Sequence, residues 1–202
     1  HARWIDVFCE TGAFTPAEQL LCGGAGAGPY LVDHEGNRYE AALDRDASVV
    51  VEDKGPQKVV ILATGWYVKR GSDGKRLSCE LPTDRLCQFR IRLTATAGSP
   101  VLRCAVSTIL TYDTSKVRLR DLAVALPLKA PQQLLVGRDG ATPAVWRADG
   151  PERYLLAHRW DAGLDDAGEQ QPRLSGWATA QCSGGVAAVA MRNLQRLFPK
   201  EI

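Results

Sequence analysis

The chain has 202 residues, with 25 Lys and Arg against 23 Asp and Glu, which gives a formal net charge of +2. This length allows one large all-β domain, or one domain with part of another. The charges do not form a long block of one sign, and no apolar run approaches the roughly 18 to 20 residues of a membrane helix. We therefore expect neither a nucleic acid nor a membrane as a partner.

Alternation of apolar and polar residues with a period of two is the strongest pattern in the sequence, and it predicts β-strands. The pattern is clearest over residues 87–95, where apolar side chains alternate with Gln, Arg and Thr. A turn at 98–100 leads to a second strand at 102–112, so we expect an antiparallel hairpin. Upstream, the runs 49–51 and 58–69 also predict strands, because they are rich in β-branched and aromatic residues.

The rest of the chain continues in the same way. Over residues 117–128 the apolar positions change face at Asp121, which predicts a β-bulge or a crossing between sheets, and Pro127 and Pro131 are expected to end that strand. A short helix is expected only at 193–197. Further strands are expected at 144–147, 154–160, 174–180 and 185–192. This spacing predicts an all-β fold, a large, supersandwich-like antiparallel β-sandwich with little helix.

The six cysteines include no C-x-x-C pair and no paired Cys and His of the zinc-ribbon kind, so we expect no metal and no other cofactor. Cys87 and Cys104 lie on the apolar side of predicted strands, which favours buried free thiols over disulfides. The glycine-rich run 23–29 lacks the Lys and Ser or Thr that complete a phosphate-binding loop. We therefore interpret it as an ordinary loop.

An unusual cluster of polar and aromatic residues ends the strand predicted at 154–160. It contains Tyr154, His158, Arg159, Trp160 and Asp161. In a strand, the period of two puts His158 and Trp160 on one face and Arg159 on the other. Two interpretations stay open. The cluster is a functional site, or it is structural, with Arg159 and Asp161 paired on the sheet surface while His158 and Trp160 pack beneath a loop.

The five tryptophans are expected mainly to fill the core. Exposure of Trp160 together with Trp177 would instead indicate contact with a sugar. Four arginines alternate with apolar residues on predicted strands, and a solvated sheet face is favoured for them over binding of an acidic polymer. These arginines are Arg90, Arg92, Arg118 and Arg120.

Several short segments stand out when they are taken in chain order. They are GPYLVD (28–33), RIRLT (90–94) with AGSP (97–100), VRLRDL (117–122), HRWDAG (158–163), and MRN (191–193) with FPKE (198–201). In sequence and in order they resemble the exo-rhamnogalacturonan lyase-like family. The resemblance runs from about Trp4 to Ile202.

Members of that family consist of an N-terminal RIFT barrel, a central β-sandwich and a C-terminal α/α toroid, and the characterised members are polysaccharide lyases that act on the rhamnogalacturonan backbone of pectin. The resemblance implies that residues 1–22 are a remnant of the barrel with a linker and that residues 23–202 are the central sandwich. The resemblance also implies that the toroid is missing from this chain, and we expect the sandwich to pack against it in a longer protein. The first residue is His1 and the one methionine is Met191, so the chain is interpreted as a piece.

The resemblance also implies a reaction, β-elimination beside the carboxylate of galacturonic acid. This reaction needs a group that neutralises the carboxylate, a base and an acid, roles that we assign to Arg159, His158 and Tyr154. The candidate substrate-binding residues are Trp160, Asp161 and Trp177.

The partner implied is an acidic, plant-type polysaccharide or oligosaccharide. We expect the chain alone to be inactive and to form one wall of a sugar cleft. The alternative is a non-catalytic carbohydrate-binding or structural β-sandwich module. A secreted or periplasmic location is expected if the parent protein degrades the polymer.

Overall fold

A computed structural model describes residues 3–10, 26–71, 84–99, 101–147, 149, 155–157, 162–165, 169–183, 185–191 and 200–201, with the backbone alone for 3–10, 155–157, 162–165, 191 and 200–201. The fold is all-β, as predicted, and its antiparallel sheets include one that curls into a half-barrel, consistent with a sandwich-like fold. One turn of 3-10 helix, η1 (Ala41–Leu43), interrupts the strands. In the described part of the chain, no helix is long and apolar enough to cross a membrane.

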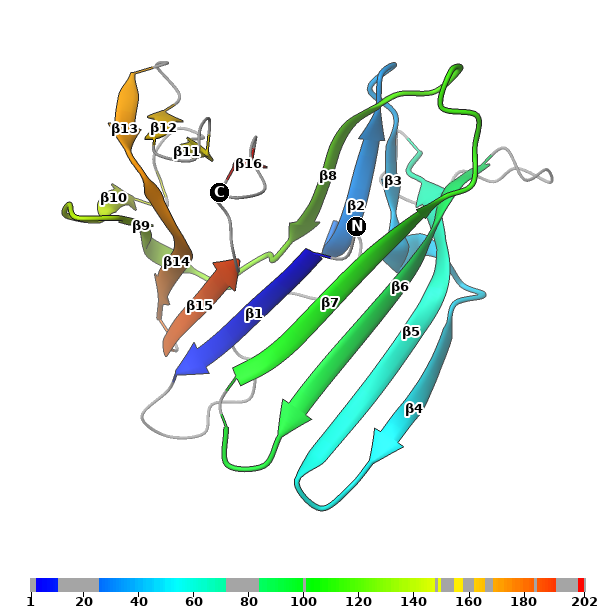
Figure 1. Ribbon diagram of the computed structural model, residues 1–202, viewed down its shortest axis with the longest axis horizontal. Helices are drawn as coiled ribbons and strands as arrows, with labels where there is room; N and C mark the ends of the chain where they lie inside the picture. The colour runs from blue at the N-terminus through cyan, green and yellow to red at the C-terminus, as the bar shows by residue number, and fades with distance from the viewer. Residues whose placement is uncertain are drawn as a thin grey trace. The chain divides into compact units, whose positions relative to one another are not determined.

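The strands fall into two compact units, and the first contains most of residues 21–127. Its sheet has the strand order β7-β6-β5-β3-β2-β8, with β4 paired to β5 as well (Figure 1). The bounds are β2 (Gly28–Asp33), β3 (Arg38–Glu40), β4 (Ser48–Lys54), β5 (Lys58–Lys69), β6 (Arg85–Thr96), β7 (Val101–Leu110) and β8 (Leu119–Ala125).

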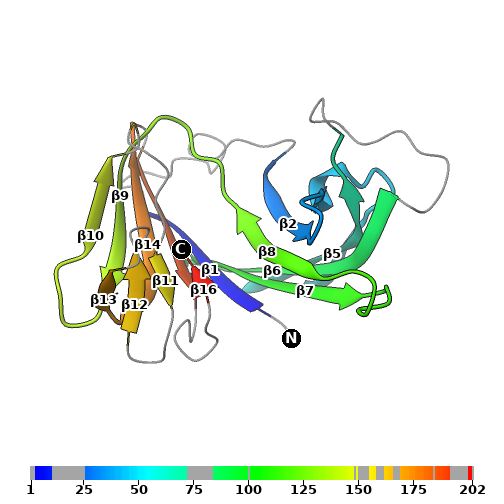
Figure 2. The ribbon, with the colours of Figure 1, turned by 90° about the horizontal axis from the view of Figure 1, so that it is seen from above.

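The inner face of this curled sheet holds the core of the first unit. In Figure 2 the sheet curls so that β2 and β8 lie across from β6. Leu31 of β2 therefore shares a cluster with Tyr67 of β5 and with Cys87 and Phe89 of β6, all of them buried. The rings of Tyr67 and Phe89 meet edge to face, with centroids 5.6 Å apart. Burial of these apolar side chains is the main force that closes the sheet.

The second unit contains most of residues 128–202 together with β1 (Arg3–Glu10). One of its sheets has the order β10-β9-β14-β15-β1 and the other the order β13-β12-β11-β16. The bounds are β9 (Pro131–Arg138), β10 (Ala144–Arg147), β11 (Leu155–Ala157), β12 (Ala162–Asp165), β13 (Gln170–Pro172), β14 (Leu174–Cys182), β15 (Gly185–Met191) and β16 (Lys200–Glu201). Val136 and Leu174 are buried together, and Trp146 packs against them.

Most predicted strands are confirmed. The run 58–69 is β5, the run 144–147 is β10, and the expected hairpin is formed by β6 and β7, which are neighbours in the sheet. The change of face at Asp121 is confirmed as a bulge, because Val32 pairs with Asp121 whereas Asp33 pairs with Leu119. The helix predicted at 193–197 lies outside the described residues, and the domain boundary at residue 22 stays a prediction.

Burial of the cysteines is confirmed for Cys87, and Cys104 is partly buried. Neither forms a disulfide, and Cys182 is a further buried free thiol. Burial raises the pKa of Cys87 to about 11 and that of Cys104 to about 11. Both thiols are therefore protonated at neutral pH, when they are poor nucleophiles.

Candidate functional site

The cluster that the sequence singles out falls outside the described residues. Tyr154 and residues 158–161 are not described, so the roles assigned to them stay predictions. The residues between them form β11, which pairs with β12 and with β16. A strand is therefore present where the sequence predicts one, at least over Leu155–Ala157.

Trp177 is the one predicted substrate-binding residue that the structure describes. It lies on β14, half-buried, and its indole ring covers Gly137 of the neighbouring strand β9. A Cβ atom at Gly137 would overlap the indole, so the glycine leaves the space that the ring fills. This contact gives Trp177 a packing role, and its expected contact with a sugar stays a prediction.

A cavity of about 380 Å³ lies in the first unit, on the strands β4 to β7 and the loop that precedes β4. Its volume is in the range of small-molecule sites. The residues that line it are Asp44, Asp46, Ser48, Thr64, Gly65, Trp66, Gln88, Phe89, Arg90 and Ile109. Most of these side chains are polar, and one is an indole.

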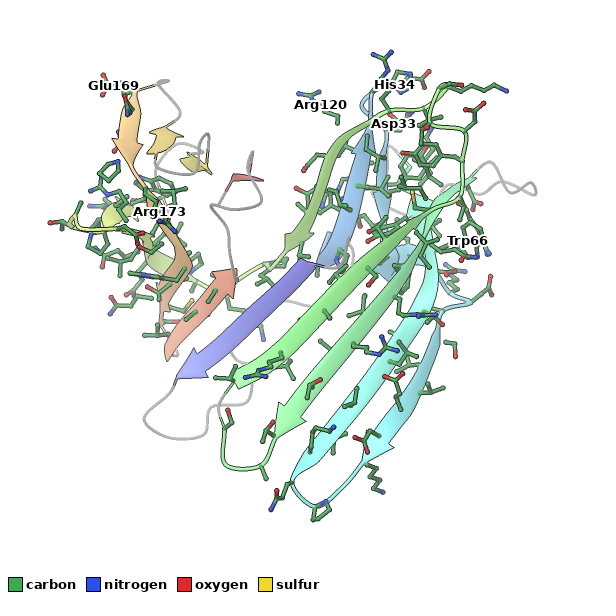
Figure 3. All side chains as sticks on the ribbon, in the orientation of Figure 1. Asp33, His34, Trp66, Arg120, Glu169 and Arg173 are labelled. Carbon is green, nitrogen blue, oxygen red and sulfur yellow. The ribbon has the colours of Figure 1, made fainter. Side chains whose placement is uncertain are left out.

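The pairing of the strands explains why these side chains meet. Ser48 pairs with Thr64 and Thr64 pairs with Arg90, so their side chains form one row across β4, β5 and β6. Trp66 pairs with Gln88 in the next row of the same face. These residues alternate along the strands with members of the core, so their side chains lie on the opposite face of the sheet. Figure 3 labels Trp66 on β5.

Asp44 forms the base of the cavity and is 9% exposed. The backbone N–H of Trp66 donates a hydrogen bond of 2.7 Å to Oδ2 of Asp44, and the N–H of Asp46 donates one of 3.2 Å to Oδ1. Along β5, the pairing with β4 reaches only as far as Thr64, and the pairing with β3 starts only at Val68. Trp66 lies between them and pairs with neither strand. The carboxylate of Asp44 thus satisfies an N–H that no strand reaches, which is a structural role.

Gly65 allows this close approach. A Cβ atom at Gly65 would lie 2.5 Å from Oδ2 of Asp44 and 2.8 Å from Cζ of Phe89. Real Cβ atoms essentially never come so close to other atoms. A side chain at this position would therefore displace the base of the cavity, the core ring beneath it, or both.

The cations around the cavity differ in whether they are already paired. Arg85 places Nη2 2.6 Å from Oδ2 of Asp46. Arg92 donates two hydrogen bonds, of 2.6 and 2.7 Å, to the carboxylate of Glu52, and this hydrogen bonding is the main reason that the pKa of Glu52 lies below its usual value. Arg90 is exposed and forms no hydrogen bond or ion pair with any residue in the described part of the chain, although its charge helps to lower the pKa of Glu52. It is the cation that a ligand in the cavity would meet.

Two other polar clusters in the first unit have structural explanations. Glu40 is buried, and its carboxylate accepts hydrogen bonds of 2.8 Å from the N–H of Gly26, from Nε of Arg38 and from Nη1 of Arg70. These bonds compensate for the loss of water around the charge. In the turn between β2 and β3, Asp33 is buried in a similar way. Figure 3 labels Asp33, together with His34 of the same turn and Arg120 of β8.

The solvated sheet face expected for the four arginines is supported in part. Arg118 and Arg120 are exposed, and Arg92 is held by its ion pair on the surface, whereas Arg90 lines the cavity. Within the described ranges, no group of three or more His, Cys, Asp and Glu residues is arranged to hold a metal ion. The cavity therefore offers hydrogen-bonding groups, one guanidinium, two carboxylates and two aromatic rings, and the residues described around it include no metal cluster.

Sequence reasoning did not find this cavity. The nearest signals were the five tryptophans and the alternating arginines, but the sequence does not say which of them meet. Comparison with protein-family models, with curated proteins and with solved structures finds no match for this chain.

Proposed function

We propose that this chain is a carbohydrate-binding β-domain of a rhamnogalacturonan lyase-like protein, and that the cavity beside Trp66 and Arg90 binds an acidic sugar. A sugar ring has hydroxyl groups around its edge and apolar C–H faces. The first suit polar side chains such as Ser48, Thr64 and Gln88, and the second suit an indole. The family resemblance supplies the substrate class, an acidic pectic saccharide.

The observation that carries this proposal is the state of Arg90. Arg85 and Arg92 each hold a carboxylate of the chain itself, whereas Arg90 is exposed, lines the cavity and forms no hydrogen bond or ion pair with the described residues, its charge attracting Glu52 only at longer range. A guanidinium binds a carboxylate through parallel N–H···O hydrogen bonds. A uronate therefore gives Arg90 a partner that a neutral sugar lacks.

The test is isothermal titration calorimetry of the whole chain with a galacturonate oligosaccharide and with a galactose oligosaccharide of equal length. One sugar residue in this cavity is expected to bind with a Kd on the order of 1 mM, the affinity of a small ligand at about 0.3 kcal/mol per atom. We expect the uronate to bind at least about tenfold more tightly than the neutral sugar, since hydrogen bonds to charged groups contribute about 1.5 to 3 kcal/mol.

Matched variants make the test specific. Arg90→Gln is expected to remove the preference for the uronate, and Trp66→Ala is expected to weaken the binding of both sugars. Arg92→Gln is the control, because it removes the same charge one row further along β6, where Glu52 already holds it. Equal affinity for the two sugars, or equal losses in Arg90→Gln and Arg92→Gln, would contradict the proposal.

β-Elimination is the second candidate function, and the resemblance around His158 favours it. In this reaction the Arg159 guanidinium neutralises the uronate carboxylate, His158 removes the proton next to it, and Tyr154 protonates the departing sugar oxygen, so that an unsaturated uronate forms. Ultraviolet absorbance of the unsaturated product, measured on rhamnogalacturonan, tests this assignment. Activity that is lost in His158→Ala would support it, and activity that survives in His158→Ala would contradict it.

A further inference from the structure

Strand β4 presents an unusual apolar edge to solvent. Every residue of Ser48–Lys54 is exposed. Three consecutive valines at its centre, Val49, Val50 and Val51, are 67%, 48% and 58% exposed. Because neighbouring residues of a strand point to opposite faces, this apolar surface is present on both faces of the sheet.

One edge of β4 pairs with β5, and in the described part of the chain no strand pairs with the other edge. The unpaired edge carries free backbone N–H and C=O groups, which are a template for a further strand. We propose that this edge pairs with β4 of a second copy of the chain, antiparallel, with the two-fold axis at Val50. The proposal does not depend on the proposed function.

The sequence of β4 selects this register. In a symmetric antiparallel pair, directly opposed residues lie on the same face, so the axis passes through a residue rather than between two residues. An axis at Val50 opposes Val50 to its own copy and Val49 to Val51 of the other copy. All three exposed valines then meet valines, which is a favourable cross-strand combination.

The neighbouring registers are worse. An axis at Val49 would oppose Val50 to Ser48 and Val51 to Ala47, so that two of the three valines would lose a valine partner. An axis at Val51 would oppose Val50 to Glu52 and Val49 to Asp53, so that the apolar side chains would meet carboxylates. Both alternatives therefore lose the pairing of valine with valine.

The acidic groups that flank the valines are paired within each copy. Asp46 lies in the turn before β4 and is held by Arg85, whose Nη2 is 2.6 Å from its Oδ2. Glu52 and Asp53 are already neutralised within their own copy, by Arg92 and by Lys58 at 2.8 Å. Lys54 has no ion pair among the described residues, and the choice of register therefore rests on the valines.

A bulge at Glu52 limits the length of the pairing, because Val51 pairs with Ile61 whereas Asp53 pairs with Val60. We therefore expect the dimer to bury less surface than the roughly 1,200 to 2,000 Å² of a stable complex. Such a dimer is weak and reversible, with a Kd on the order of 100 μM.

Sedimentation velocity over a range of concentrations tests the dimer. The parent chain is expected to shift from monomer to dimer between about 10 μM and 1 mM. Val50→Lys opposes two lysines at the axis and is expected to weaken the dimer at least tenfold. Val145→Lys is the matched control, since Val145 is 51% exposed on β10, which forms the end of its own sheet. A monomer at 1 mM, or equal behaviour of the two variants, would overturn the proposal.

Cysteine cross-linking tests the register. Val49→Cys, Val50→Cys and Val51→Cys are each oxidised under dilute conditions, and the disulfide-linked dimer is followed by non-reducing electrophoresis against the parent chain and Val145→Cys. Directly opposed residues have Cβ atoms about 4.5 to 5.5 Å apart, close to the distance a disulfide needs. Val50→Cys is expected to link fastest. Faster linkage at Val49 or Val51, or no gain over Val145→Cys, would overturn the proposal.

Discussion

Asp33 has a structural role that depends on its charge. Its carboxylate accepts hydrogen bonds from the N–H groups of Glu35 and Asn37, from the side-chain amide of Asn37 and from the hydroxyl of Tyr39. Burial alone would raise the pKa of Asp33, but these hydrogen bonds outweigh it, and the pKa lies below its usual value of 3.8. The ionised form therefore holds the turn between β2 and β3.

This lowered pKa gives a prediction about pH. The stabilisation from Asp33 is fully present above pH 3.8 and is lost as the pH falls through its lower, folded-state pKa. Asp33→Asn, a neutral mimic of the protonated form, is expected to lower the free energy of unfolding by about 1 to 3 kcal/mol at pH 7. That difference should shrink as the pH falls below 3.8.

Urea unfolding of both chains at several pH values measures this difference. Asp53→Asn is the control, because Asp53 belongs to an exposed ion pair with Lys58, and such a pair contributes about 0 to 1 kcal/mol. A difference between Asp33→Asn and the parent that stays constant down to pH 2.5 would show that the charge of Asp33 is not what stabilises the turn.

Gly65 gives a prediction about packing at the base of the cavity. Gly65→Ala is expected to destabilise the chain by about 1 to 3 kcal/mol, because the new methyl group overlaps Asp44 and Phe89. Gly55→Ala is the matched control, since its nearest contact, the carbonyl oxygen of Lys58, would lie 3.6 Å away. Thermal unfolding measures both variants. Equal changes in Tm would show that the close approach at Gly65 carries no cost.

At the scale of elements, the sequence predicted strands well where one face is buried. The full length of β5 and of β10 follows from the local pattern, and the bulge in β8 follows from the change of face at Asp121. β9 was not predicted, because Pro131 was interpreted as a stop. Proline lacks an N–H but is tolerated as the first residue of a strand, which is where Pro131 lies.

The contact between β9 and β14 gives a further prediction. Gly137→Ala is expected to destabilise the chain by about 1 to 3 kcal/mol, because the added methyl group overlaps the indole of Trp177. In the background of Trp177→Leu, the same substitution is expected to cost less, since the smaller side chain can move aside. A double-mutant cycle from urea unfolding measures the coupling. Additive effects of the two substitutions would contradict this account of the pair.

At the scale of the whole molecule, the candidate cavity could not be predicted from local sequence. It brings together a loop aspartate, an indole on β5 and a guanidinium on β6, and these meet only through strand pairing between positions far apart in the chain. The state of Arg90 depends on the third dimension as well, because the ion pair of Arg92 with Glu52 is a contact across 40 residues. The alternating pattern shows that both arginines face solvent, but it does not show which one is paired.

Binding of an acidic sugar beside Trp66 and Arg90 is best tested by a two-dimensional NMR titration of the ¹⁵N-labelled chain with galacturonate, read at the indole N–H signals. We expect the Trp66 signal to move and to saturate, the Arg90→Gln chain to need at least about tenfold more galacturonate for the same movement, and the Trp146 and Trp177 signals to stay in place. A fixed Trp66 signal, with movement at Trp160 or Trp177 instead, would contradict the account and direct attention to the cluster around His158.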